Sequence, residues 1–303
     1  MIIPVYNVAE FLQECLDSVI QQTYPNIEII CVNDGSTDNS LDILKRYSQK
    51  FNHLQIINQA NAGLSAARNT GIRHAKGDYV FFLDSDDFLY DCNVIETMVN
   101  EAAKDNLDIV FGSFQYYYGE NSNINKVFKV NHNMVNKIMK GIQLLEKGIR
   151  TNTVNSVVWN KLYRYDLIKN EFFLDGLLYE DMEYTIRIFL KARRVKMLDI
   201  LTVNYRQREN SIMSSKVNFK KAIDYVNIAK KILEIKQENK FISTWVAICI
   251  YKALKNSREL EEKEKSQVLN EINSITNLPK IFFESTSIKH KLFGIYIKIF
   301  GLN

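Results

Sequence analysis

Short apolar runs alternate with segments of helical periodicity along the first third of the chain. The runs that predict strands are short and rich in β-branched and aromatic residues, and they cover residues 2–5, 27–32, 54–57 and 79–83. Between them, apolar residues recur on one helical face over residues 11–20, 39–49 and 64–75. This alternation predicts an α/β fold, in which a mostly parallel sheet is covered by helices on both faces.

Polar clusters follow three of these predicted strands. They are Tyr6-Asn7, Asn33-Asp34-Gly35-Ser36 and Asp84-Ser85-Asp86-Asp87. In parallel sheets of this kind, ligands bind beyond the carboxyl ends of the strands, so the three clusters are expected to meet at one crevice. Residues 1–112 therefore form a half of nucleotide-binding type.

The last cluster places three carboxylates within four residues, directly after a predicted strand. Like charges this close repel one another unless a cation or hydrogen-bond donors stabilise them. Oxygen ligands select Mg²⁺ or Mn²⁺, which proteins often bind through one or two carboxylates together with substrate phosphates. The alternative is an Asp-rich turn, because Asp and Ser are common turn formers.

The other clusters suit different parts of a nucleotide. The bend at Pro4, Tyr6 and Asn7 can present backbone groups and an aromatic ring to a base, and Asp34 can accept a hydrogen bond from a base N–H. Gly35 permits a tight turn, although helix capping by a neighbouring residue explains part of this segment equally well.

The helix that starts at Gly63 carries small residues and one arginine. Small residues suit close packing against the sheet, and Arg68 can place a cation near phosphate; the alternative is a solvated arginine on a tightly packed helix.

Two segments of the second half carry further candidates. Glu180 and Asp181 are adjacent acids before a helical pattern, where interaction with the helix dipole is the ordinary explanation and catalysis the alternative. Trp159 suits either the core or stacking on a sugar. The basic residues Arg206 and Arg208 follow an apolar run at 200–205 and are either phosphate ligands or surface arginines.

Composition narrows the class of protein. The chain has 303 residues, 46% of them hydrophobic, and a formal net charge of +4, which suits a globular protein with a large core. Its four cysteines show no close paired spacing, so neither a zinc ribbon nor a disulfide framework is indicated, and Cys15 and Cys31 are expected in the core. No apolar run is long enough to span a membrane, and we expect a cytoplasmic location.

The order and spacing of these motifs resemble those of bacterial family 2 glycosyltransferases. The resemblance covers about residues 1–210 and rests on Ile3-Pro4-Val5-Tyr6-Asn7, Val32 to Asp38, Gly63 to Gly71 and Asp84 to Asp87. It implies the GT-A fold and a nucleotide-sugar donor, commonly a UDP-sugar. Residues 113–212 would then be the acceptor-binding and catalytic half of the same domain.

Carried over residue by residue, the resemblance implies a role for each candidate. Asp86 would bind Mn²⁺ or Mg²⁺, and Asp181, with Glu180 beside it, would be the catalytic base. The segment of Trp159 and Lys161 would face the acceptor. The donor would be bound by Pro4, Tyr6, Asn7, Asp34, Gly35, Arg68, Asp84, Ser85 and Arg208.

The C-terminal region, residues 213–303, predicts helices over 219–235, 241–254 and 261–275. Its last stretch, 288–300, interleaves lysines with bulky apolar residues, as in a helix at a membrane interface. A terminal helix docked on the protein's own core or on a second subunit is the alternative. Nucleic acid is not expected as a partner, because the basic residues are dispersed and form no recognised binding motif.

The family resemblance, taken together with these residues, implies one functional class and leaves two alternatives. The first is an inverting glycosyltransferase that extends a surface glycan, such as lipooligosaccharide, capsule or another lipid-linked saccharide, at the inner face of the cytoplasmic membrane. The alternatives are a non-catalytic protein that binds sugar nucleotides and a sugar nucleotidyltransferase. The presence of both Asp86 and Asp181 favours catalysis, and no glycine-rich, lysine-bearing triphosphate loop is evident near the start.

Overall fold

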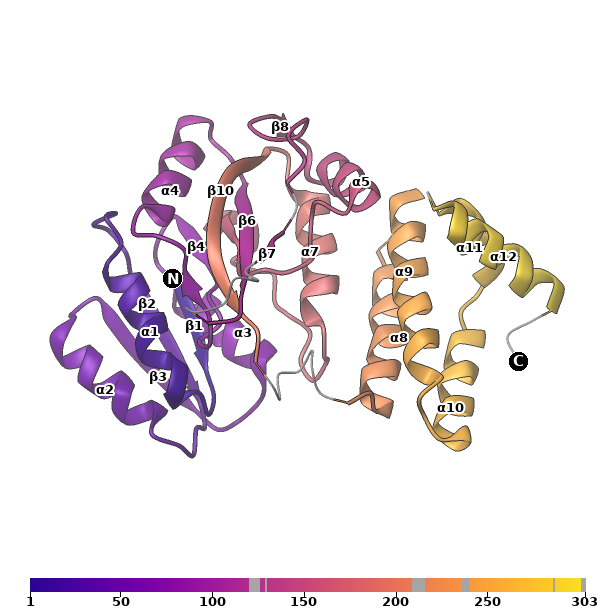
Figure 1. The fold of residues 1–303 in the computed structure, drawn as a ribbon, viewed down its shortest axis with the longest axis horizontal. Helices are drawn as coiled ribbons and strands as arrows, with labels where there is room; N and C mark the ends of the chain where they lie inside the picture. The colour runs from indigo at the N-terminus through magenta and orange to yellow at the C-terminus, as the bar shows by residue number, and fades with distance from the viewer. Residues whose placement is uncertain (120–125, 129, 209–215, 236–239, 286, 301–303) are drawn as a thin grey trace. The chain divides into compact units, whose positions relative to one another are not determined.

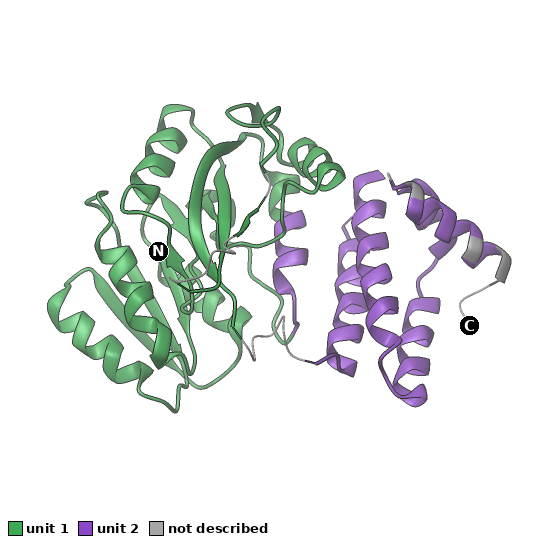
Figure 2. Ribbon diagram, in the orientation of Figure 1, with its two compact units in different colours: residues 1–176, 188–209 green, residues 177–187, 210–303 purple. Residues whose placement is uncertain are grey.

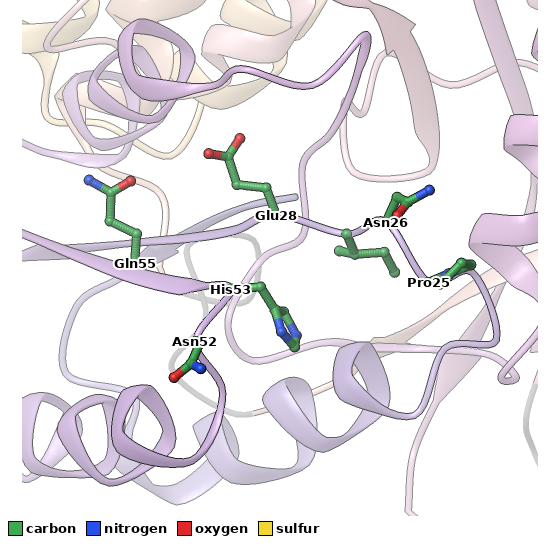
Figure 3. A pocket seen from close by; sticks show the side chains of 7 residues that line it. Pro25, Asn26, Glu28, Asn52, His53 and Gln55 are labelled. Carbon is green, nitrogen blue, oxygen red and sulfur yellow. The ribbon is translucent and has the colours of Figure 1, made fainter.

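A computed structural model of the chain describes residues 1–119, 126–128, 130–208, 216–235, 240–285 and 287–300 (Figure 1). The chain divides into two compact units, which Figure 2 distinguishes by colour. The first unit comprises residues 1–176 and 188–209, and the second comprises residues 177–187 and 210–303. The boundary therefore falls within helix α7 (Glu180–Lys191).

Three parallel strands form one half of the sheet in the first unit. They are β1 (Ile2–Val5), β2 (Ile29–Asp34) and β3 (Leu54–Gln59), with β2 in the middle. A parallel bridge between Ile2 and Phe82 joins β1 to the end of β4 (Tyr79–Phe81). Because parallel neighbours need a crossover connection, helices link these strands: α1 (Ala9–Ile20), α2 (Ser40–Lys50) and α3 (Leu64–His74).

Alternate residues of β2 face two different hydrophobic clusters. Ile29 and Cys31 pack in a cluster with buried residues of α1 and α2, whereas Ile30 and Val32 pack with Ala67 of α3. Since successive side chains of a strand point to opposite faces, helices cover the sheet on both sides, as predicted. The close approach of α3 requires a glycine at position 71, where a Cβ would lie 2.3 Å from Cγ2 of Ile2.

The other half of the sheet mixes parallel and antiparallel pairs. Its strands follow the order β4, β9 (Lys161–Arg164), β6 (Ile109–Tyr117), β10 (Val195–Arg206) and β5 (Phe88–Leu89). β10 runs parallel to β6, and β9 lies antiparallel to β4 and β6. The short strands β7 (Lys126–Val127) and β8 (Ile138–Met139) pair with β6 and β10. Helices α4 (Val94–Lys104), α5 (Gly141–Thr151) and α6 (Tyr165–Ile168) complete this unit.

The second unit is helical, as predicted for the C-terminal region. Besides residues 180–187 of α7, it contains α8 (Phe219–Leu233), α9 (Lys240–Ser257), α10 (Glu262–Asn273), α11 (Leu278–Glu284) and α12 (Ile288–Phe300). Its interior is lined by fully buried apolar residues such as Val226 of α8, Ile250 of α9 and Phe282 of α11. Within the described ranges, no helix combines the length and the apolar character needed to cross a membrane.

Candidate active site

The ends of β1 and β2 are joined by side chains of the predicted donor site. Asn7 adopts a left-handed backbone conformation, with φ of 48°. Its backbone N–H donates to Ser36 Oγ at 3.2 Å, and its Oδ1 accepts from the Thr37 N–H at 2.8 Å. Tyr6, next to it, is 50% exposed, whereas Pro4 is buried in β1. The bend predicted after the first strand is therefore present and leaves an aromatic ring in solvent.

Asp34 ends β2 and is 3% exposed. Its Oδ1 accepts from Gln59 Nε2 at 2.7 Å and from the Ala62 N–H at 2.9 Å, and its Oδ2 accepts from the Gly63 N–H at 2.8 Å. The carboxylate thus ties the end of β2 to the segment that precedes α3. A carboxylate has about four acceptor positions, so the predicted contact with a base N–H remains open to it.

Gly35 makes the turn that follows Asp34. Its φ is 71°, and a Cβ at this position would lie 2.8 Å from the backbone nitrogen of Asn61. Both observations require glycine, because other residues rarely adopt this conformation and none would fit the space.

The carboxylates that follow β4 are each contacted by an arginine. Arg68, which is 2% exposed, reaches Asp84 Oδ1 with Nη2 at 2.7 Å. Arg208 donates from Nε to Asp86 Oδ2 at 2.7 Å, and its Nη2 forms an ion pair with the same oxygen at 2.7 Å. The backbone N–H of Arg206 donates to Asp87 Oδ1 at 2.8 Å.

Arg206 also holds the backbone of the carboxylate segment. Its Nε donates to the Asp86 carbonyl at 2.9 Å, and its guanidinium lies 4.9 to 5.3 Å from the ring centres of Phe11, Phe88 and Tyr117. It forms an ion pair with Glu14 as well. Local sequence does not indicate this role of Arg206, because its partner Glu14 lies 192 positions away in the chain.

Burial and neighbouring negative charges act on two of these carboxylates. Burial raises the pKa of Asp86, and the Asp84 carboxylate raises it further, while Arg208 acts in the opposite direction. Burial, followed by the charges of Asp86 and Asp84, raises the pKa of Asp87 well above its usual range. Asp87 Oδ2 is buried and has no hydrogen-bond partner. Additional positive charge would stabilise the ionised forms of these groups.

The donor set bears on the predicted metal. Among the residues that the structure describes, no three His, Cys, Asp or Glu side chains are grouped as a metal site. One carboxylate, that of Asp86, is nevertheless the type of ligand with which proteins hold Mg²⁺ or Mn²⁺ when a substrate diphosphate supplies further oxygens. The residues fit an ion bound together with the donor better than one bound alone.

The two predicted acceptor residues are buried, which corrects that interpretation. Trp159 is 5% exposed and packs between Phe114 and Tyr205, with ring centres 4.7 and 5.0 Å away. Lys161 is fully buried and donates from Nζ to the carbonyls of Asn155 and Val157. Of the two alternatives for Trp159, the structure therefore supports the position in the core. Lys161 ties together the loop before β9. Neither side chain is exposed to an acceptor.

Glu180 and Asp181 lie in the first turn of α7, in the second unit. Glu180 is 7% exposed, and Asp181 is half-buried. The residue before them, Tyr179, has a φ of 61° and stacks on Tyr225 with ring centres 4.4 Å apart. A bulky residue in this conformation is strained, so the stacking stabilises an unusual entry into α7.

Glu183, in the first turn of α7, is 4% exposed, which is unusual for a carboxylate. Its two carboxylate oxygens accept from Nε and Nη2 of Arg187 at 2.7 and 3.0 Å. This bidentate ion pair explains how a carboxylate can be buried one turn from the helix start. Residues 210–212, expected to be a loop next to Arg208, lie outside the described residues.

Comparison with known proteins decides the family. The model of glycosyl transferase family 2 matches residues 1–172. This chain belongs to glycosyl transferase family 2. Its relatives include glycosyltransferase GlyA of Streptococcus pneumoniae, which is 37% identical over 70% of this chain and 31% of its own length. The cholesterol galactosyltransferase of Borreliella burgdorferi is 34% identical over 71% of this chain and 62% of its own length.

This family 2 chain spans 31% to 64% of the length of the first three curated relatives that it matches. Among solved structures, the crystal structure of residues 1–349 of Staphylococcus aureus TarS with UDP-GlcNAc superposes with a TM-score of 0.75 at 21% identity, covering 99% of this chain and 87% of TarS. The likeness confirms the GT-A fold implied by the motifs.

Proposed function

We propose that this chain is an inverting glycosyltransferase that transfers a hexose or N-acetylhexosamine from a UDP-sugar to a saccharide acceptor. The observation that carries the proposal is the cluster of Asp84, Asp86 and Asp87 with three arginines, at the end of β4 in a family 2 chain. Such a cluster offers both charge signs to a diphosphate and its cation.

The donor would lie along the carboxyl edge of β1, β2 and β4. Tyr6 has an exposed ring for the base, and Asn7 and Gly35 shape the loops around it. Asp84 and Ser85 would contact the ribose side, with Arg68 acting through Asp84 because its guanidinium is buried. UDP as the nucleotide is supported by the TarS complex with UDP-GlcNAc.

A divalent cation at Asp86 would stabilise the charge that grows on the departing nucleoside diphosphate. A neighbour of similar fold, a mannosyltransferase of Pyrobaculum calidifontis, was solved with GDP-Man and Mn²⁺, at a TM-score of 0.57 and 14% identity. Arg208 would then move from Asp86 to the diphosphate, since a cation and a guanidinium compete for the same carboxylate oxygen.

Asp181 would act as the general base. A sugar hydroxyl is too weak an acid to attack unaided at neutral pH, so a carboxylate must take its proton as the new bond forms. Glu180, buried beside Asp181, would support it. Direct attack on the side opposite the leaving group inverts the anomeric carbon, and no covalent intermediate on the enzyme forms.

The acceptor would be a saccharide of a surface glycan, such as lipooligosaccharide, capsule or a related polysaccharide. A relative 32% identical over 65% of this chain is the poly(ribitol-phosphate) beta-glucosyltransferase of Bacillus spizizenii, which supports a cell-surface polymer. We place the reaction at the inner face of the cytoplasmic membrane, where lipid-linked acceptors are available.

The test is a panel of UDP-sugars incubated with the protein and Mn²⁺ or Mg²⁺, with release of UDP as the readout. Slow hydrolysis of one donor is expected even without an acceptor. Asp181→Asn should lower turnover about a thousandfold, the range of general base catalysis, with donor binding unchanged. Glu262→Gln, whose side chain is 85% exposed on α10, is the control.

Three other outcomes would contradict the proposal. Turnover that survives Asp181→Asn would remove Asp181 from the role of base. Tight UDP-sugar binding without UDP release, for any donor and acceptor, would favour the non-catalytic binding protein. Release of pyrophosphate from a nucleoside triphosphate would favour a nucleotidyltransferase.

A further inference from the structure

One face of α12 exposes apolar side chains among lysines. Leu292 is 62% exposed and Ile295 is 43% exposed, so two large aliphatic side chains three residues apart lie in solvent. Lys289, Lys291 and Lys298 are exposed on the same helix. We call these five residues the α12 face.

Helix geometry places the five residues on one side of α12. Successive residues are about 100° apart, so Lys298 and Lys291 lie at one border, Ile295 and Leu292 in the centre, and Lys289 at the other border, within an arc of about 180°. The apolar centre is therefore flanked by ammonium groups on flexible stems. This is the arrangement in which lysines can stay at a polar boundary while their apolar neighbours enter a less polar medium.

The opposite side of α12 packs against other residues of the second unit, so the α12 face points away from the interior of that unit. His290 is 9% exposed and Ile297 is 8% exposed, and His290 Nδ1 lies 2.9 Å from Ser285 Oγ. A Cβ at Gly294 would lie 2.8 Å from the Cβ of Phe282 in α11, so the two helices are in close contact. The alternative of a docked terminal helix is thus correct for one side of α12 only.

Charge decides which partner suits the α12 face. The sequence contains no Asp or Glu between residue 285 and the last residue, 303, so the face carries positive charge only. A second copy of the chain, docked through the same face about a two-fold axis, would bring lysines against lysines. An anionic lipid surface instead provides negative headgroups for the lysines and acyl chains for Leu292 and Ile295.

We propose that the α12 face docks this protein on an anionic lipid bilayer, with Leu292 and Ile295 inserted below the headgroups. The surface lies within the second unit and uses none of the residues proposed for transfer. It would hold the enzyme where lipid-linked acceptors are made, but the docking does not depend on the transfer reaction.

The experiment measures co-sedimentation of the full chain with vesicles of phosphatidylcholine alone or with 30% phosphatidylglycerol added, at low and high salt. The bound fraction should be large only with the anionic vesicles and should fall as salt rises, because screening weakens the attraction of lysines to the surface. The double variants Leu292→Gln with Ile295→Gln and Lys291→Gln with Lys298→Gln should each weaken partitioning by about tenfold.

The matched control is Lys104→Gln with Lys263→Gln, two exposed lysines of other helices, which should change partitioning less than twofold. UDP release in solution should be the same in all variants, so a failure of docking is separable from a failure of the proposed reaction. Because all substituted side chains are exposed, thermal unfolding should also be unchanged.

The proposal is overturned if the α12 variants bind anionic vesicles like the native chain, or if the control variant loses binding equally. Equal binding to neutral vesicles would also overturn it. Sedimentation velocity tests the alternative occupant. If the native chain is a dimer and the double variant Leu292→Gln with Ile295→Gln is a monomer, the α12 face contacts a second copy instead of a bilayer.

Discussion

Arg208 forms a hydrogen bond and an ion pair with the same oxygen of Asp86 that we propose for the cation. The two positive groups would therefore exclude each other at this carboxylate, and the diphosphate is the natural second partner of the guanidinium. At the level of single residues, Arg68, Arg206 and Arg208 compensate the charge of the three carboxylates, and the proposed donor and cation would replace the contact of Arg208 with Asp86.

Substitution of Arg208 should consequently have opposite effects on metal and on catalysis. Arg208→Gln should strengthen binding of Mn²⁺ alone by about tenfold, or roughly 1.4 kcal/mol, and should slow UDP release. Titration calorimetry with Mn²⁺ in the absence of nucleotide measures the first effect. Arg150→Gln, an exposed arginine of α5, is the control, and unchanged Mn²⁺ affinity in Arg208→Gln would show that the guanidinium does not block the ligand.

Lys161 offers a second test at this scale. Truncation to Ala leaves the partly buried carbonyls of Asn155 and Val157 without their donor, so the free energy of unfolding should fall by about 2 kcal/mol. Urea unfolding measures it, with the exposed Lys147→Ala as the control. A variant of native stability with impaired acceptor binding would restore the acceptor role that burial argues against.

The carboxylates of residues 84–87 and the two acceptor candidates, Trp159 and Lys161, show what can and what cannot be predicted from local sequence. The position of Asp84, Ser85 and Asp86 after a strand was predictable from the apolar run before them, and their roles remain a proposal. Trp159, Lys161 and Glu183 have side chains whose burial depends on residues distant in the chain, such as Phe114 for Trp159. No local pattern distinguishes an exposed tryptophan from one that is buried in this way.

At the scale of elements, α12 is attached to α11 through a buried histidine. Burial is the main cause that lowers the pKa of His290 below 6.5, and the nearby Lys289 charge adds to it. Because the folded pKa lies below that of the unfolded segment, the unfolded form takes up the proton first as pH falls. The contribution of His290 to stability is therefore complete above pH 6.5 and is lost as the pH drops through the lowered folded pKa.

We therefore expect hydrogen exchange of the α11 and α12 amides to accelerate between pH 7 and pH 5, after correction for the intrinsic pH dependence. His290→Gln, which cannot titrate in this range, should abolish the acceleration. Acceleration that persists in His290→Gln would assign the effect to another group. The exposed His132→Gln should behave like the native chain.

The strands and helices themselves followed the hydrophobic pattern closely. The exception is β10, which was predicted from Ile200 but begins at Val195, where it pairs with Ile109 of β6. The hydrophobic pattern assigned residues 195–199 to no strand, because pairing with β6, eighty-odd positions earlier, is invisible in a local window. Pairing between distant strands thus extended an element that periodicity had shortened.

At the scale of the whole molecule, the division into two units has a consequence for ligand binding. All proposed ligands of the donor and its cation lie in the first unit, whereas Asp181 and the α12 face lie in the second. Binding of UDP and Mn²⁺ should therefore stabilise the first unit directly, by about 2.7 kcal/mol at a hundred times the dissociation constant.

Scanning calorimetry should show this as a higher unfolding temperature in the presence of UDP and Mn²⁺. Asp86→Ala should lose most of the shift, whereas Asp42→Ala, a substitution of a side chain that is 74% exposed on α2, should keep it. An equal shift in Asp86→Ala would place the cation at other ligands.

Hydrophobic periodicity and the order of the motifs were enough to predict the α/β fold, its helical C-terminal region and the family, because these depend on neighbours a few residues apart. Only the tertiary structure shows which candidate site residues are exposed, which arginine contacts which carboxylate and which side of α12 faces solvent. Those properties depend on contacts between residues far apart in the chain, such as Glu14 and Arg206, which are 192 positions apart. Because such contacts form only in the folded chain, a local stretch of sequence does not determine which side chains are buried or which charges are paired.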